Sequence, residues 1–304
     1  MAASAGSLTK LCVEPGASAH TFDTNSEPYR FWNVGLKRRG TIIDPNTIQG
    51  TRSHPSERTR SGPSLTRGPI TMPASPLDLD AWLQRAMGGT KTVNAIAVAD
   101  TLPWFGVLVQ YYSGKTIEYK DCKLDRLILQ GNAHQEGQEP EPISMSLDIV
   151  GLTTAVDTSY PSLTLGTAAG NYPYTFCDAT TSQVSSSRTI RAFTLVIDNH
   201  IRPIWGNGSC TPTDLMESDR TVVYSVYVPF TSANADLYAQ SAAGTTGTLV
   251  LTNGSLSCTF TFGVLQAPIV GPSIEHKGEV LLPITYVARK VSSTMEIAVS
   301  NVSS

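Results

Sequence analysis

The sequence predicts a mainly β protein built from two tandem β-sandwich or barrel-like units, each with one flanking α-helix. Thr, Ser, Gly and Val are abundant, and these residues favour strands and turns over helices. Residues 56–59 (Ser-Glu-Arg-Thr) return with one acidic exchange as residues 218–221 (Ser-Asp-Arg-Thr), and each copy precedes a helix signal that contains Asp-Leu. Because similar segments in the same order indicate a repeated unit, we expect one β unit to occur twice.

Length and charge limit the classes of function. The 304 residues suffice for one large or two medium domains. Charged residues make up only 15% of the chain, well below the usual quarter, which favours a surface partly covered by neighbouring copies. The net charge of −3 and the pI of about 6.0 argue against a nucleic-acid clamp, which would carry a basic excess. A mildly acidic wall would still let DNA slide past without sticking.

The termini and the cysteines give no sign of secretion. The first residues carry one Lys, at position 10, and no apolar run, so we expect no signal peptide. No stretch approaches the ~18 apolar residues of a membrane span. The cysteines are odd in number and form no Cys-x-x-Cys pair, which favours buried free thiols over disulfides or zinc; they are Cys12, Cys122, Cys177, Cys210 and Cys258.

The first unit is expected over residues 29–151, after an N-terminal arm over 1–28 that a neighbouring copy would order. Within the unit, segment 49–69 is rich in Arg, Pro and Gly without a hydrophobic period, which predicts a long loop or an extended hairpin. Apolar or alternating runs predict strands at 29–36, 69–73, 93–99, 105–112, 116–119, 124–129 and 143–149.

A helix is predicted to follow the strand at 69–73. Ser75 is a good N-cap, Pro76 suits the first turn, and Asp78 completes a capping-box arrangement. An apolar stripe at helical spacing predicts packing on a sheet, and Gly88-Gly89 ends the helix; the stripe consists of Leu79, Trp82, Leu83 and Ala86. We interpret Trp82, and Tyr238 in the second helix, as core anchors.

The second unit is expected over residues 188–304, after a connector over 152–187 that is rich in Thr, Ser, Gly and Pro. A shorter helix signal covers 236–240, with Ser232 before it and Gly244 after it. Asn253-Gly254 predicts a tight hairpin. The predicted strands lie at 189–197, 221–228, 248–251, 256–262, 279–288 and 294–299.

The order of these features resembles the tail tube protein of long-tailed bacteriophages, in its longer, duplicated form. The shared order is an Arg-bearing loop, a strand, a Ser/Pro-capped helix with Asp-Leu, a Gly-Gly stop and a set of strands. That set includes residues 122–129 (Cys-Lys-Leu-Asp-Arg-Leu-Ile-Leu), followed by 143–149. Residues 277–284 (Lys-Gly-Glu-Val-Leu-Leu-Pro-Ile) are similar to the end of the longer members. The resemblance covers roughly residues 29–300.

The resemblance implies a virion protein, made in the host bacterial cytoplasm, whose inner strands join those of its neighbours around a lumen. Rings would stack into a tube through which the genome passes. Duplicated members resemble trimers whose two domains imitate six subunits, so a ring of three chains is expected and a hexamer is the alternative. The implied partners are further copies, tail terminator and tail tip proteins, the tape measure protein in the lumen, and viral DNA in transit. No cofactor is implied, and a contractile sheath is left open.

A basic set in the first unit is the candidate for contacts between subunits or rings. Arg pairs with carboxylates through two hydrogen bonds, which suits such contacts. A solvated loop is the alternative, and direct DNA contact is least favoured because tight phosphate binding would impede passage. The roles of Arg58 and Arg220 are left open. The set consists of Lys37, Arg38, Arg39, Arg52, Arg58, Arg60 and Arg67.

The sequence gives little support for catalysis. Gly114-Lys115-Thr116 would fit a phosphate-binding loop only with Gly at Val109 and a helix after it, so a hairpin turn is the better interpretation. The five His residues lack metal-ligand spacing, and no Gly-x-Ser-x-Gly elbow occurs, although a triad can assemble in space. We therefore predict a structural protein; the alternatives are another phage β-protein, such as a baseplate, decoration or adhesin subunit, and a β-rich hydrolase.

Overall fold

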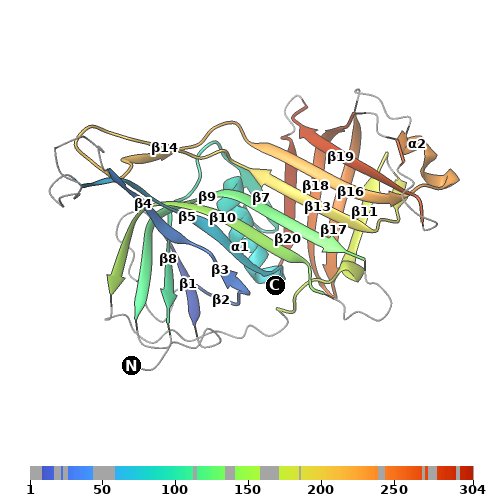
Figure 1. The fold of residues 1–304 in the computed structure, drawn as a ribbon. Coiled ribbons are helices and arrows are strands. Elements are labelled where there is room, and N and C mark those ends of the chain that lie inside the picture. Colours follow the sequence, from blue (N-terminus) through green and yellow to red (C-terminus); the bar gives the residue numbers. More distant parts are fainter. Residues whose placement is uncertain are drawn as a thin grey trace.

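The computed structural model describes residues 9–16, 22, 27–43, 59–111, 115–133, 141–157, 171–184, 186–238, 244–268, 271–272, 279–291 and 295–303. The chain forms two β lobes joined by a continuous antiparallel sheet, and helix α1 (Pro76–Met87) lies between the lobes (Figure 1). The prediction of a mainly β protein is confirmed. The division into two tandem units stays a prediction.

The strands of the first half span residues 10–157, and those of the second half span 179–302. The first set is β1 (Lys10–Pro15), β2 (Glu27–Tyr29), β3 (Asn33–Val34), β4 (Lys37–Ile43), β5 (Arg60–Pro73), β6 (Gly88–Thr92), β7 (Ala95–Val98), β8 (Phe105–Gln110), β9 (Thr116–Asn132) and β10 (Ser144–Asp157). The second set is β11 (Ala179–Gln183), β12 (Ser186–Arg188), β13 (Ala192–Asp198), β14 (Arg202–Ile204), β15 (Asp214–Met216), β16 (Thr221–Pro229), β17 (Thr245–Asn253), β18 (Leu256–Gln266), β19 (Leu281–Arg289) and β20 (Ile297–Val302).

The order of strand pairing in the first half recurs in the second. In the first half β1 pairs with β2 and β8, β9 joins β8 to β10, and β5 pairs with β10 on one side and with β3 and β4 on the other. In the second half β11 pairs with β12 and β17, β18 joins β17 to β19, and β16 pairs with β19 on one side and with β13 on the other. We call strands in the same place of these two series counterparts.

Strand β9 belongs to both lobes. Its first part pairs with β8, its last part pairs with β13 of the second half, and β10 accompanies it over most of its length. A second pairing between the halves joins β20 to β7. Two strands were predicted where the structure has β9, because a register shift opposite Asp148 and Ile149 leaves Asp125 as an extra residue and disturbs the alternation.

Helix α1 packs its apolar stripe into the core, as its spacing predicts. All four stripe residues are fully buried, and Trp82 contacts Tyr29 and Phe105 with ring centroids 5.4 and 5.7 Å apart. Gly88 ends the helix with φ 85°, a left-handed conformation that glycine adopts without strain.

The cap at the start of α1 differs from the predicted capping box. Ser75 makes no side-chain bond to the helix backbone, because its hydroxyl donates to the Asp78 carboxylate instead. The Leu77 amide is satisfied by Asn171, whose Oδ1 accepts it at 3.0 Å. A distant residue therefore supplies the cap that local sequence was expected to supply.

The second half departs from the sequence expectations in its helix and in the predicted connector. The helix signal there yields a 3₁₀ turn, η4 (Ser232–Asn234), and one helical turn, α2 (Ala235–Tyr238); the side chain of Tyr238 lies outside the described residues. Residues 152–187 contain the end of β10, a 3₁₀ turn, η3 (Phe176–Asp178), and the pairing strands β11 and β12. Small hydroxyl residues form these strands, so no apolar alternation marked them.

None of the five cysteines, all of which lie in the described residues, forms a disulfide bond. Cys12, Cys122 and Cys258 are buried as expected, and burial raises the pKa of the latter two thiols far above the usual range. The expectation of burial was wrong for Cys177 and Cys210, which are exposed. Cys210 lies in the irregular segment between β14 and β15, where its carbonyl accepts the Ser64 amide and its thiol lies 3.5 Å from the Ser61 carbonyl of β5.

Candidate assembly surfaces

The predicted basic set forms part of a strand pair, which we call the basic arm: β4 and residues 60–67 of β5. Its register places Lys37 opposite Arg67, Arg39 opposite Leu65, and Ile43 opposite Arg60. Lys37, Arg38, Arg39, Arg60 and Arg67 are all exposed. Arg52 and Arg58 lie outside the described residues. The structure thus brings five of the seven predicted residues together on one pair of strands.

The arm corrects the prediction of a loop over 49–69 for its described part, where the extended hairpin is the right alternative. Residues that alternate along β5 are buried, but they are Gly62, Ser64, Thr66 and Gly68 rather than large apolar residues. Small inward residues let neighbouring backbone come close: a Cβ on Gly68 would lie 2.1 Å from the Gly35 carbonyl oxygen. Burial therefore alternates along β5 with the period of two that is typical of a strand, but the hydropathy of these residues does not alternate with it.

An ion pair and a hydrogen bond to a hydroxyl fix the base of the arm. Arg67 donates to Asp125 at 2.5 Å, and the Ile201 amide donates to the other carboxylate oxygen at 2.7 Å. Burial nevertheless raises the pKa of Asp125, against the lowering effect of the Ile201 amide and of Arg67. Arg38 donates to the Ser64 hydroxyl at 2.9 Å. Arg67 is therefore an anchor of the arm, whereas Lys37, Arg39 and Arg60 extend from it as exposed cations.

A segment of the second half, residues 199–217, lies along the arm and fastens it. The Ser64 amide donates to the Cys210 carbonyl at 2.7 Å, which extends the β5 side of the arm by one more backbone segment. Lys123 binds Glu217 at 2.6 Å and the Leu215 carbonyl at 2.9 Å, and its ammonium lies 4.1 Å from the centre of the Trp104 ring. Figure 1 shows β14 of this segment running toward β4.

Two polar side chains of the second half satisfy the end of helix α1. Asn199 donates to the carbonyls of Ala86 and Leu124 at 3.1 and 3.0 Å. Arg220 donates to the Met87 carbonyl at 3.2 Å and to the Asn199 side chain at 3.1 Å. A cation here complements the partial negative charge of the helix terminus and supplies donors for its last carbonyls.

Arg220 therefore has a structural role that its sequence did not indicate. It also donates to the Ala99 carbonyl at 2.8 Å and lies 3.5 Å from Glu296. The repeat around it does not coincide with the strand register. Strands β5 and β16 can be aligned on their last residues, Pro73 and Pro229, because these pair with the first residues of β10 and β19. In this alignment Thr221 corresponds to Leu65, whereas the sequence repeat would match it with Thr59.

A second surface is the outward face of the six strands β5, β10, β9, β13, β16 and β19, which we call the central face. One row across it reads Pro73, Ser144, Gln130, Thr194, Ser225 and Thr285. The next row reads Thr71, Ser146, Ile128, Val196, Val223 and Val287. Neither row carries a charge. A third row holds Asp148, Arg126 and Asp198, where Arg126 donates to Asp198 at 2.7 Å and neutralises it.

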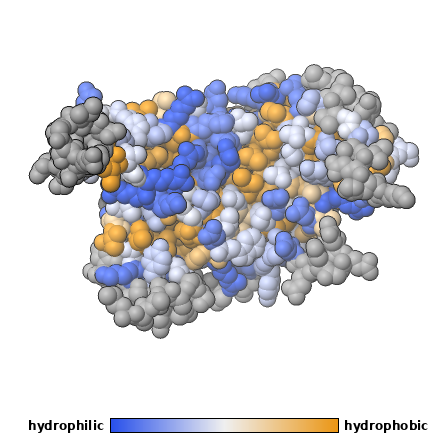
Figure 2. Space-filling model, in the orientation of Figure 1, coloured by the Kyte–Doolittle hydropathy of each residue, from blue (hydrophilic) through white to orange (hydrophobic). Residues whose placement is uncertain are grey.

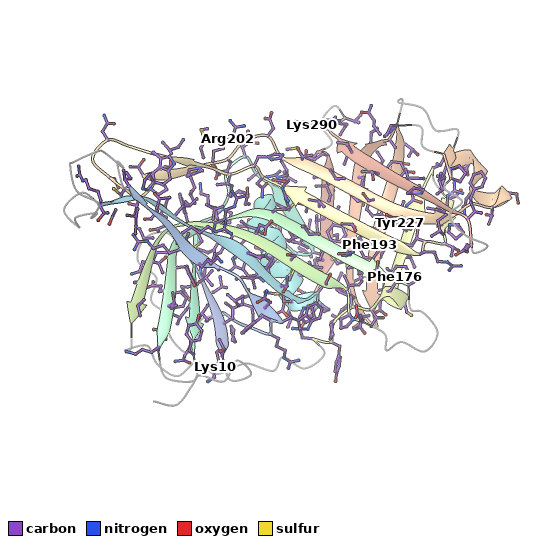
Figure 3. The ribbon with its side chains drawn as sticks, in the orientation of Figure 1. Lys10, Phe176, Phe193, Arg202, Tyr227 and Lys290 are labelled. Atoms are coloured by element: carbon purple, nitrogen blue, oxygen red, sulfur yellow. The ribbon has the colours of Figure 1, made fainter. Side chains whose placement is uncertain are left out.

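The sheet has an inner face that is packed into the core and an outer face that is exposed. Tyr227 belongs to the central face and is 47% exposed, whereas Phe193 points inward and stacks on Phe176 with ring centroids 6.3 Å apart (Figure 3). In Figure 2 hydrophilic residues gather where the lobes meet, beside a hydrophobic stretch on the second lobe. The face therefore combines neutral polar and short aliphatic groups across both halves.

Among the described residues, a hydroxyl, an imidazole and a carboxylate lie in contact one after another, but their hydrogen bonds and ion pairs are part of the sheet structure. His200 lies 3.3 Å from Asp198 and 3.1 Å from the Thr221 hydroxyl. Asp198 forms an ion pair with Arg126 and accepts the His200 amide at 3.0 Å. Its carboxylate therefore stabilises the end of the sheet. The Tyr111 amide donates to the Lys115 carbonyl, and Gly114 of the predicted hairpin turn lies outside the described residues. In the described part of the chain, no three metal-ligating side chains come together, and no helix is long and apolar enough to span a bilayer.

An elongated β chain with an exposed basic arm and with two uncharged rows of side chains across both halves has the features of a structural protein. A family model described as phage tail tube protein matches residues 6–288, so the chain belongs to the phage tail tube protein family. The resemblance to a tail tube protein is confirmed, the duplicated form stays a prediction, and the chain is a structural component of the phage tail. No curated protein matches the chain.

We predict that Glu217→Ala costs about 3 kcal/mol of unfolding free energy, because it leaves the buried Lys123 ammonium without its carboxylate. Burial alone would raise the pKa of Glu217, but the hydrogen bonds from Lys123 and the Leu102 amide lower it below its ordinary value of 4.5. The stability from this group is therefore present above pH 4.5 and is lost as the pH falls through the lower, folded pKa.

Urea unfolding at pH 7 and at pH 4, followed by circular dichroism, measures both effects. Glu217→Gln is the control for charge, since it keeps the side-chain volume and removes the titration. Equal stability of Glu217→Ala and the parent protein at pH 7 would show that the segment 199–217 is not fastened by this pair.

Proposed function

We propose that this chain is the major tail tube subunit, and that three copies form a ring whose stacks make the conduit for DNA ejection. The observation that carries the proposal is the central face, which runs through strands of both halves and has two uncharged rows across all six strands. The repeated order of pairing supports a duplicated unit, so that three chains would present six similar segments around the lumen. The predicted domain boundaries belong to this proposal.

The central face is suited to line the lumen. DNA binding depends on cations that replace condensed counterions, and the two uncharged rows offer none. Hydroxyl and amide groups keep the wall hydrated without holding phosphates. Within the third row, the guanidinium of Arg126 is already paired with Asp198. DNA would pass in transit without sequence-specific binding.

The basic arm is suited to contact another copy. Residues 37–67 hold seven of the 22 Lys and Arg residues and two of the 25 Asp and Glu residues, so this segment is net +5 while the rest of the chain is net −8. Such asymmetry favours contact between the arm of one copy and the acidic remainder of another. Residues 10–15 of the predicted N-terminal arm 1–28 form β1, which pairs with β2 and β8 and buries Leu11, Cys12 and Val13 in the same chain, so they are not offered for contacts between rings.

The other proposed partners follow from the same role. A tube needs tail tip and tail terminator proteins at its ends and a tape measure protein in its lumen during assembly. We expect the protein in the virion tail, after synthesis in the host cytoplasm, and we expect no catalytic activity.

The proposed function predicts that the purified protein forms rings or tubes of uniform width with three-fold symmetry. Electron microscopy of concentrated protein, with and without tail tip proteins, tests this directly. A protein that stays monomeric in both conditions would contradict the proposal, and six-fold identity of chains would favour the hexamer.

Thr194→Lys is predicted to leave the tube intact and to slow genome ejection, because three added cations per ring would attract passing phosphates. The measurement is ejection from phage assembled with the variant, at low and high salt, since salt screens the attraction. Val93→Lys is the matched control, as Val93 is 85% exposed in the turn between β6 and β7, away from the central face. Normal genome ejection by phage with Thr194→Lys tubes would contradict the proposal that the central face lines the lumen.

Replacement of Arg52, Arg58 and Arg60 by Ala is predicted to weaken assembly and to leave the subunit folded, since an exposed substitution usually costs under ~0.5 kcal/mol. Thermal unfolding checks the fold, and the protein concentration needed for tube formation checks assembly. The control is Arg191→Ala, which removes an exposed Arg that pairs with Glu279 on the second lobe. Loss of the fold, or unchanged assembly, would contradict a contact role for these residues.

A further inference from the structure

The tripeptide Asn-Gly-Ser occurs twice in the chain, as residues 207–209 and 253–255. Asparagine is a thermolabile residue, because the backbone amide nitrogen of the following residue can attack its side-chain carbonyl carbon. Glycine in the following position hinders this attack least, because it has no Cβ. The two copies share the reacting groups, so we expect a difference in their reactivity to come from their conformation.

The first copy lies in the loop 205–213 between β14 and β15. The Thr213 amide donates to the Ile204 carbonyl at 2.8 Å, which closes the loop. Asn207 and Gly208 are exposed and form a turn, and among the described residues neither the Asn207 side chain nor the Gly208 amide has a hydrogen-bond partner. A Cβ built on Gly208 would meet nothing within 4 Å beyond its chain neighbours. The backbone between these two residues is therefore free to rotate.

The second copy is held at the end of a strand pair. Asn253 is the last residue of β17 and lies opposite Leu256, the first residue of β18. Its side chain donates to the Tyr172 carbonyl at 3.4 Å. Ring closure requires the peptide bond after the asparagine to swing toward the side chain, which moves ψ away from the extended value of a strand. Asn253 must therefore leave the strand pair before it can react.

We propose that Asn207 is a site of spontaneous deamidation in the folded protein and that Asn253 is protected. The Gly208 amide nitrogen gives its proton to hydroxide and attacks Cγ of Asn207, and the side-chain nitrogen leaves as ammonia. The new C–N bond closes a succinimide ring. One water molecule then opens this ring at either carbonyl, which gives aspartate or isoaspartate. The sum of these steps consumes one water and releases one ammonia, without oxidation or reduction.

The product carries a new carboxylate on a loop that is fastened to the basic arm. Cys210 of the same loop accepts the Ser64 amide of β5 through its carbonyl. Each event makes the formal net charge of −3 one unit more negative, because a neutral amide becomes a carboxylate that is ionised at pH 7. Modified and unmodified chains therefore differ in charge beside the basic arm.

Incubation of the purified protein in mildly alkaline buffer tests the proposal, because hydroxide accelerates ring closure. Peptide mapping by mass spectrometry measures the fraction of aspartate and isoaspartate at each of the two asparagines over time. We expect Asn207 to be converted about tenfold faster than Asn253, because local opening must precede the reaction at Asn253. Equal rates at the two sites, or conversion at neither, would overturn the proposal.

Incubation in urea separates the effect of conformation from that of the flanking sequence. The strand pair is lost in urea, so the two rates should approach each other. A difference that persists there would show that flanking residues set the rates, and it would overturn the protection of Asn253 by the fold.

Asn207→Gln is the matched variant, since it keeps the amide and its longer side chain closes a ring far more slowly. Isoelectric focusing should show a main acidic species that accumulates in the parent protein and not in this variant. Equal accumulation in both proteins would show that Asn207 is not its source.

Discussion

The antiparallel ladder along β9 is the constraint on which the rest of the structure depends. A strand of 17 residues pairs with β8, β10 and β13, so its backbone groups are satisfied by both halves. A buried peptide group that is left unpaired costs about as much free energy as a lost hydrogen bond. The ladder along β9 pairs a long run of such groups. The two lobes are therefore joined by shared strand pairing and not by a linker alone. The central face is continuous because β9 runs through both lobes.

Polar side chains at the base of the arm and at the end of α1 follow from this ladder. The bulge at Asp125 turns that carboxylate toward Arg67 and Ile201, while Asn199 and Arg220 reach the end of α1. Each of these contacts joins residues more than 50 positions apart. Packing alone would let the arm and the helix adopt several angles against the sheet, whereas directional hydrogen bonds select one.

How much the sequence predicts depends on how local the determining physics is. Helix α1 was predicted because its stripe and its Gly88 stop are local, and the alternating strands β10 and β16 for the same reason. The start of β5 was left between a loop and an extended hairpin because its inward residues are Gly, Ser and Thr, and β9 was split because of the bulge. The cap from Asn171 and the role of Arg220 are long-range, so no pattern near them pointed to either. The basic residues were recognised as a set, but the register that pairs β4 with β5 was not, because it depends on contacts across the hairpin.

Two strand edges in the described part of the chain carry features that oppose pairing with an identical edge. Lys37, Arg38 and Arg39 follow one another at the start of β4, for which β5 is the one partner strand among the described residues, so two such edges repel each other. Pro283 removes an amide donor from β19, which on the side away from β16 pairs with a described strand at residues 287–289 only. Charge protects one edge and the missing donor protects the other, because an exposed strand edge would otherwise pair with any similar edge that it meets.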